Sequence, residues 1–417
     1  MTKMYRSIVW FVLAMLIIAC AAPVTTISLT PSPVPSPTQK PMPTVSIARY
    51  PEPAIFSGFN VFTQAPVYDP KSSEPWQVDL RSSDLTTLDL SKSTSDLLFA
   101  DFDSKTQWPS FDKMPGDFDW QKIMEIGKDP GLGIRALHEQ DITGKGIGIA
   151  IIDQTLLVDH IEYRDHLRLY EEPESRDRGM AASMHGPAVA SIAVGRTVGV
   201  APEANLYYLA ASLCFENNDF SCLARSVRRI IEVNKTLPAD RKIRVLSISR
   251  GWAPVELGYA DIMTAVKEAS AEGIFVISSS LSQTHGLNFH GLGRSPLSEP
   301  NDFWSYQPGL WWADSFYSDG FYYSPALLVP MDSRTTASPT GTKDYVFYRQ
   351  GGWSWAIPYL AGMYALAVQV KPEITPEEFW NTALNTGKII QIGHNGKNYE
   401  FGIILDPQTL IEEIKSK

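Results

Sequence analysis

The chain has 417 residues, 44% of them hydrophobic and 20% charged, a composition typical of a globular protein with a sizeable core. This length is sufficient for two domains of ordinary size or for one large domain with appendages. The formal net charge of −10 argues against a nucleic-acid partner, because neutralising phosphate groups requires an excess of Lys and Arg.

The N-terminus has the features of an export signal. Lys3 and Arg6 precede an unbroken apolar run from Ile8 to Ala19, which is short for a membrane span and has the size of a signal-peptide core. The run ends in Leu-Ile-Ile-Ala-Cys at Cys20, which resembles the bacterial lipobox. This resemblance implies that residues 1–19 are a lipoprotein signal peptide and that Cys20 is lipidated. The alternative is an ordinary signal peptide with an incidental Cys.

Residues 20–53 are rich in Pro, Ser and Thr, with four prolines in the segment Pro31–Pro37. Such a stretch cannot build a core and tends to stay extended. We interpret it as a tether that holds the following domain off the extracytoplasmic face of the cell membrane. The membrane is then a partner through the N-terminal lipid.

Cysteine usage fits export. The sequence has three cysteines, and lipidation of Cys20 leaves Cys214 and Cys222 as an even pair in an oxidising setting. The sequence is compatible with a disulfide between them and with two separate buried thiols.

Residues 54–130 differ in sequence pattern from the rest of the chain. An Asp-Leu step recurs every five residues, at Asp79, Asp84 and Asp89. A short period can wind a β-helical coil, but three copies are a bare minimum for a solenoid. We therefore expect a strand-and-turn segment that packs on another part of the protein. The sequence does not indicate its role.

Residues 131–417 show the alternation of an α/β protein. Short buried-strand patterns cover 147–152, 204–209, 244–248 and 273–277, and helical patterns cover 186–194 and 261–272. Strands that alternate with helices at this spacing indicate βαβ units and a parallel sheet covered on both faces.

Four segments of this region stand out, in the order Thr143–Asp153, Met184–Ala193, Val245–Gly251 and Gly352–Gly362. Together they resemble the motifs of the subtilisin-like serine peptidases (the subtilase family). The order Asp, His, Ser is the subtilisin order, which differs from that of chymotrypsin and of the α/β-hydrolases. The resemblance implies a subtilisin-like α/β fold, a mostly parallel central sheet with helices on both faces, and a serine endopeptidase that acts on polypeptides.

The resemblance assigns the catalytic triad to Asp153, His185 and Ser354. Asp153 follows a strand, and open α/β sheets place their sites at the carboxyl ends of strands. A lone Asp is more often a helix cap, and a lone His is more often structural. Here both carry matching flanks, although Gln154 and Ala188 depart from the family pattern.

Ser354 is expected at a helix N-terminus, where backbone N–H groups and the helix dipole favour the oxyanion of a tetrahedral intermediate. The alternative is a serine that merely caps a helix. Trp353 and Trp355 are unusual neighbours that should alter the mouth of the site.

The same resemblance suggests two further groups. Ser249, Arg250 and Gly251 occupy the place of a strand that pairs with the substrate backbone, and we expect an edge strand there. Ser282 falls where the family places the oxyanion-binding Asn, so a shorter side chain would donate that hydrogen bond.

The stretch Phe303–Tyr323 is dense in aromatic residues, which either pack an insertion or form a surface for peptide or cell-wall glycan. Members of the family often bind calcium, but no acidic loop matches a calcium site, so we expect no metal and no cofactor. Two alternatives to an active peptidase stay open: a weak or inactive subtilase fold that binds peptide or glycan, and an envelope scaffold.

Overall fold

The computed structural model describes residues 46–56, 61–72, 74–174, 177–212, 214, 219–319 and 325–417. The predicted signal peptide, Cys20 and most of the predicted tether lie outside this part of the chain. Of the helices within it, none combines the length and the apolar character that a membrane span requires.

The strands are β1 (Val78–Asp79), β2 (Ala100–Asp103), β3 (Gly148–Asp153), β4 (Leu167–Glu171), β5 (Asn205–Ala210), β6 (Ile243–Ile248), β7 (Phe275–Ser278), β8 (Phe289–Arg294), β9 (Tyr306–Pro308), β10 (Leu327–Pro330), β11 (Arg334–Ala337), β12 (Tyr345–Tyr348), β13 (Lys388–His394) and β14 (Lys397–Ile404). The α-helices are α1 (Thr94–Leu97), α2 (Trp120–Lys128), α3 (Ile134–His138), α4 (His185–Val194), α6 (Phe220–Thr236), α7 (Tyr259–Ala271), α8 (Leu281–His285), α9 (Ala313–Asp319), α10 (Trp353–Val370), α11 (Pro376–Thr386) and α12 (Pro407–Ser416).

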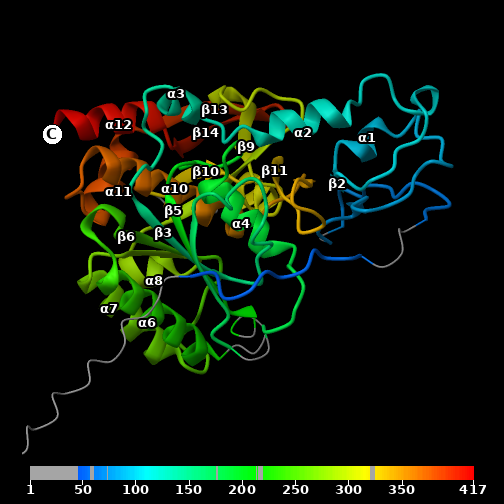
Figure 1. The fold of residues 1–417 in the computed structure, drawn as a ribbon. Coiled ribbons are helices and arrows are strands. Elements are labelled where there is room, and N and C mark those ends of the chain that lie inside the picture. Colours follow the sequence, from blue (N-terminus) through cyan, green and yellow to red (C-terminus); the bar gives the residue numbers. More distant parts are fainter. Residues whose placement is uncertain are drawn as a thin grey trace, which may run out of the picture. The chain divides into compact units, whose positions relative to one another are not determined.

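A five-stranded parallel sheet forms the centre of the fold, in the order β4-β5-β3-β6-β7 (Figure 1). Strand β3 lies in the middle, with Asp153 at its carboxyl end. The strands and helices expected from the sequence pattern are present, and their bounds lie within two residues of the expected ones.

Helices cover both faces of this sheet. In β3, Ile149 and Ile151 face the core cluster that contains α4 and α10, whereas Ala150 and Ile152 face the cluster that contains α6 and α7. Figure 1 shows α6 and α7 together on one side and α4 and α10 on the other. The alternation follows from the two-residue period of a strand. This architecture confirms the expected α/β class, with a parallel central sheet and helices on both faces.

A second sheet, in the order β13-β14-β10-β8-β9, carries the aromatic stretch that begins at Phe303. Trp312 and Phe316 are buried in the main core, while Trp304 and Trp311 are exposed. Tyr322 and Tyr323 lie outside the described residues. The stretch therefore packs largely as core, and two tryptophans remain on its surface.

The region 54–130 forms a third layer with its own small core. Strand β2 pairs with β12, in the sheet order β1-β2-β12-β11, so the region is joined to the α/β part by backbone hydrogen bonds. Both parts belong to one compact unit, Pro43–Lys417, and the expected boundary at residue 131 stays a prediction.

The Asp-Leu steps have a structural explanation. Each leucine is buried, and its N–H donates to a carbonyl oxygen in the next pass of the chain, in the pairs Leu80–Asp101, Leu85–Gln107 and Leu90–Lys113. Each aspartate accepts a hydrogen bond from the N–H two residues later, in the pairs Asp79–Arg81, Asp84–Thr86 and Asp89–Ser91. The repeat thus alternates a turn-forming Asp with an inward Leu, as expected of a strand-and-turn segment.

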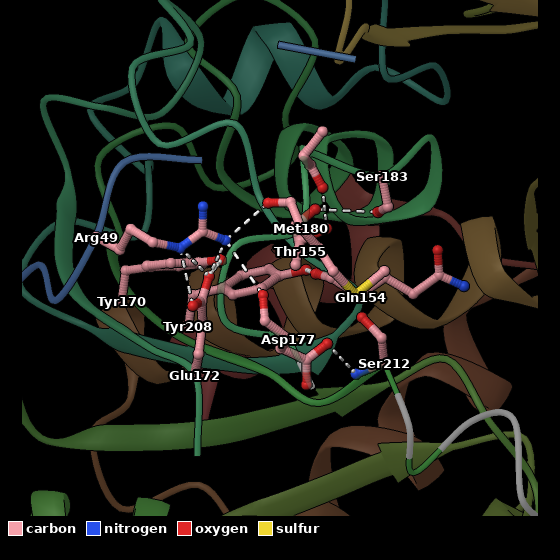
Figure 2. A network of polar contacts seen from close by, with 11 residues as sticks. Arg49, Gln154, Thr155, Tyr170, Glu172, Asp177, Met180, Ser183, Tyr208 and Ser212 are labelled. Carbon is pink, nitrogen blue, oxygen red and sulfur yellow. Dashed lines mark hydrogen bonds and ion pairs between the residues drawn. The ribbon is translucent and has the colours of Figure 1, made fainter. Parts of the chain in front are cut away.

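The segment 46–54 runs along the outer edge of the central sheet. The N–H of Ala48 donates to the carbonyl oxygen of Tyr170 in β4, and the N–H of Tyr170 donates to that of Ser46. Arg49 binds the carboxylate of Glu172 at 2.9 Å through Nε and donates to the carbonyl oxygen of Met180 at 2.8 Å (Figure 2). The end of the predicted tether is therefore attached to the segment that precedes His185.

Cys214 and Cys222 form a disulfide with 5.5 Å between their Cα atoms. The bond joins Cys214 to the first turn of α6. Of the two readings left open by the sequence, the structure has the paired cysteines.

Candidate active site

Asp153 ends the central strand β3, and its side chain is fully buried. One carboxylate oxygen, Oδ1, accepts a hydrogen bond from the N–H of Gln154 at 2.8 Å and lies 2.6 Å from Nδ1 of His185. The other oxygen has no hydrogen-bond partner among the described residues. A buried carboxylate is costly without a partner, so the imidazole is the group on which its charge depends.

His185 is the first residue of α4, and the next residue allows the helix to come close to Asp153. A Cβ atom on Gly186 would lie 2.7 Å from the carbonyl oxygens of Gln154 and Thr155 and from the hydroxyl of Tyr208. Only glycine fits this approach without displacement.

The segment before His185 is also fixed to the end of β3. The hydroxyl of Ser183 donates to the carbonyl oxygen of Thr155 at 3.0 Å (Figure 2). It accepts from the N–H of Gly186 at 2.9 Å, and the hydroxyl of Thr155 donates to the carbonyl oxygen of Ala181. These bonds connect the residues after Asp153 to those around His185. They set the distance between the two candidate catalytic groups.

Ser354 is the second residue of α10, which begins after the extended Gly352. Its backbone carbonyl oxygen accepts a hydrogen bond of 3.2 Å from the hydroxyl of Ser249, just beyond the end of β6. Ser354 therefore stands in the first turn of a long helix, next to the carboxyl ends of the central strands. Anions are favoured at such a position.

Two of the three candidate residues lie at one cavity of about 440 Å³. His185 and Ser354 both line it, together with Gln154, Met184 and Trp355, and Asp153 lies behind His185. Within the described chain no hydrogen bond joins His185 to Ser354; such bonds are often long without substrate and tighten on binding.

The environment of His185 acts on its protonation in two directions. Burial lowers the pKa of the imidazole, but the charge of Asp153 and the hydrogen bond to it raise the pKa, and the net pKa lies above the ordinary histidine value. Trp355 packs edge-on against the ring, and Tyr348 packs edge-on against Trp355. The arrangement suits a group that accepts a proton and is stabilised once charged.

Residues 144–306 match the family model described as the subtilase family. This part of the chain is therefore similar to the subtilases. The matched range includes Asp153 and His185 and ends before Ser354. The serine protease AprX of Bacillus subtilis (strain 168) is 27% identical over an alignment of 276 residues, and the alignment covers 57% of this chain. The chain spans about 60% of the length of that relative.

Solved structures with similarity to the chain include a maturation protease, a macrocyclase domain and a subtilisin-like proteinase. The prenylagaramide maturation protease PagA has a TM-score of 0.47 and 18% identity, over 68% of this chain and 98% of the other. The PatG macrocyclase domain has a TM-score of 0.45 and 14% identity, over 68% and 95%. A cold-adapted subtilisin-like serine proteinase has a TM-score of 0.43 and 16% identity, over 59% and 83%.

The cavity at His185 and Ser354 is also lined by residues that the sequence did not indicate. Trp76 and Arg81, from the region 54–130, line the cavity beside Tyr348 and Gln350. Arg81 pairs with Asp79 at 2.6 Å, and its guanidinium lies 5.5 Å from the centre of the Tyr348 ring. These contacts depend on the pairing of β2 with β12, which cannot be predicted from a local sequence pattern.

The expectation of an edge strand at Ser249–Gly251 is wrong. Strand β6 ends at Ile248 and is an inner strand, hydrogen-bonded to β3 on one side and β7 on the other. The carbonyl oxygen of Arg250 accepts a hydrogen bond from Ser279. Contact of these residues with a substrate stays a prediction.

Ser282 is exposed near the start of α8 and is not among the residues that line the cavity with His185 and Ser354. Helix α8 begins directly after β7, which turns the chain at Leu281. The role of Ser282 as an oxyanion donor stays a prediction.

Among the described residues, one group of three potential metal ligands comes together: Glu174, Cys214 and Cys222. The two cysteines of this group form the disulfide, so their sulfur atoms are not thiolate ligands. We therefore do not assign a metal centre to it.

Proposed function

We propose that this protein is a serine endopeptidase that hydrolyses polypeptides through Asp153, His185 and Ser354. The observation that carries the proposal is the 2.6 Å contact between His185 and the buried Asp153, at a cavity that Ser354 also lines. The match to the subtilase family supports it. A buried acid that orients a histidine beside a serine is the arrangement of nucleophilic acyl transfer.

In the proposed reaction, Nε2 of His185 takes the proton of the Ser354 hydroxyl while Oγ attacks the scissile carbonyl carbon. The C–N bond of the tetrahedral intermediate then breaks, and the imidazolium donates its proton to the leaving amine. Water then attacks the acyl carbonyl carbon while Nε2 takes its proton. The ester bond to Ser354 breaks as the imidazolium returns the proton to Oγ, which releases the carboxylic acid product. Asp153 holds Nδ1 as a donor and stabilises the imidazolium, consistent with the raised pKa of His185.

The oxyanion is proposed to bind at the N-terminus of α10, where the N–H groups of the first turn and the helix dipole favour negative charge. Ser282 is the proposed side-chain donor, in the place of the family's Asn. Its exposed position and short side chain favour a weak contribution. Loss of one such donor costs roughly 3 kcal/mol of transition-state stabilisation, so a slow or narrowly specific peptidase is expected.

We further propose that the peptidase acts outside the cell membrane, attached through a lipid on Cys20. The lipobox-like segment and the proline-rich residues 20–53 support this location. Segment 46–54 is attached to the edge strand β4, so the tether would end on the peptidase itself.

The activity is tested by incubating a mixed peptide library with the wild-type protein and with Ser354→Ala. We expect cleavage products only with the wild type, at a common set of bonds. Identical products from both proteins would show that Ser354 is not the nucleophile. No products from either would favour a binding role for the fold.

A further inference from the structure

A second cavity, of about 330 Å³, lies next to the one at Ser354. Trp76 and Gln350 line both cavities, so the two are neighbours with a shared wall. The second cavity lies between the region 54–130, which contributes Tyr68 and Phe99, and the aromatic stretch, which contributes Trp311. A polypeptide bound at Ser354 and His185 can therefore place a nearby side chain in it.

The walls of this cavity are aromatic. Trp76 and Trp311 are both large exposed side chains, with 53% and 45% of their surface accessible. Tyr68 stacks on Phe99 with 3.6 Å between ring centres, and Trp311 packs edge-on against Trp353, the neighbour of Ser354. Aromatic faces attract organic cations, best when the faces are those of Trp or Tyr.

The charges that line the cavity are mainly negative. Glu74, Asp101 and Asp314 contribute three carboxylates and Arg349 contributes one guanidinium. Glu74 and Asp314 are exposed at the rim, whereas Asp101 is 1% exposed. Arg349 donates to the carbonyl oxygens of Leu98 and Arg294, and no ion pair joins it to Asp101 among the described residues.

Asp101 is the group with unused bonding capacity. Its Oδ1 accepts a hydrogen bond from the N–H of Arg349 at 2.6 Å, while its Oδ2 has no partner in the described part of the chain. Burial raises the pKa of this carboxyl to about 7, although the backbone hydrogen bond from Arg349 and the charges of Arg81 and Arg349 lower it. A cation bound beside Oδ2 would offset the cost of the buried charge.

We propose that this cavity is a subsite for a basic side chain, Lys or Arg, of the polypeptide substrate, with Asp101 at its base and Trp76 and Trp311 as its walls. The inference rests on the proposed peptidase function, since it names the substrate class of the same site. A small inorganic cation fits less well, because the three carboxylates are not among the described groups whose ligand atoms converge within 4.8 Å. A flexible ammonium or guanidinium group does not require such convergence.

The test measures binding to full-length Ser354→Ala, which cannot cleave, by titration calorimetry. The probes are two sets of eight-residue peptides. In the first set a single Lys occupies each position in turn, and in the second set methionine takes the place of that Lys. We expect the Lys peptide to bind about tenfold more tightly than its Met counterpart at one position, the low end for a hydrogen bond to a charged group.

Asp101→Asn should reduce this preference to less than about threefold. Glu74→Gln combined with Asp314→Asn should also reduce it, which provides a second reading if Asp101→Asn does not fold. Glu139→Gln, an exposed carboxylate outside the cavity, is the matched control and should keep the full preference.

Equal affinities of the Lys and Met peptides at every position, or a preference unchanged in both variants, would overturn the subsite, as would absence of binding by all peptides. If the wild type cleaves peptides without a preference for Lys, the subsite is refuted but the proposed peptidase function is not. A Lys preference that depends on Asp101, in a protein that cleaves no peptide, would refute the proposed activity and leave the subsite.

Discussion

The indole ring of Trp355 packs edge-on against the imidazole of His185, with 5.4 Å between the ring centres. The imidazole thus contacts both an aromatic ring and the buried carboxylate of Asp153. The indole limits the contact of the imidazole with water, and the carboxylate favours its charged form. Trp355, which follows Ser354 in the chain, thus shields the imidazole, and Asp153 stabilises its charge.

The pH dependence of kcat/KM tests this environment. A general base must be neutral, and the pKa of His185 is raised, so activity should increase with pH with a midpoint above 6.5. In Asp153→Asn only the lowering effect of burial remains, so the midpoint should fall, and kcat should drop roughly 10⁴-fold. Rates measured from about pH 5 to about pH 9 give both quantities. The exposed Asp165→Asn is the control for net charge, and an unshifted midpoint in Asp153→Asn would contradict the assignment.

Gly186 tests the approach of α4 to the end of β3. A methyl group there meets three oxygen atoms at 2.7 Å, two of them in the backbone. We expect Gly186→Ala to lose about 1–3 kcal/mol of stability and most of its kcat, because the helix must move His185 away from Asp153. Gly116→Ala has open space around the added methyl and should behave like the wild type. Denaturant unfolding and peptide kinetics are the measurements, and an unaffected Gly186→Ala would mean that the close approach is not required.

The region 54–130 should remain covalently attached in the mature protein. Its strand β2 pairs with β12, and Trp76 and Arg81 line the cavity at Ser354. Self-cleavage after it would also release the peptidase from its own lipid anchor. The intact mass of purified active protein decides this: a species that begins near residue 130 would identify the region as a removable propeptide.

Membrane attachment should depend on Cys20. The Cys20→Ser protein should either keep its signal peptide or appear in the soluble fraction outside the membrane, since a single thiol carries the lipid. Fractionation with detection of the mature N-terminus measures this. Recovery of the variant in the membrane fraction as a processed lipoprotein would show that the lipobox interpretation is wrong.

The sequence predicted the elements that carry the candidate site, because their signals are local. A buried strand that ends in Asp153, small residues after His185 and a helix start at Ser354 are each visible within about ten residues. The order of the strands in the sheet does not follow from a local pattern. The prediction of an edge strand at Ser249–Gly251 therefore failed, because β6 is an inner strand. The contribution of Trp76 depends on contacts between distant segments, and its left-handed backbone, with φ of 55°, is uncommon for a bulky residue.

The most direct measurement of the central claim is covalent labelling by a fluorophosphonate probe, which reacts with serines that an adjacent base activates. We expect one label on the wild-type protein, on Ser354, and no label on Ser354→Ala with unchanged thermal unfolding. The exposed Ser416→Ala should label as the wild type does. Labelling of Ser354→Ala at the wild-type level, or absence of label from a folded wild-type protein, would contradict an activated nucleophile at this position.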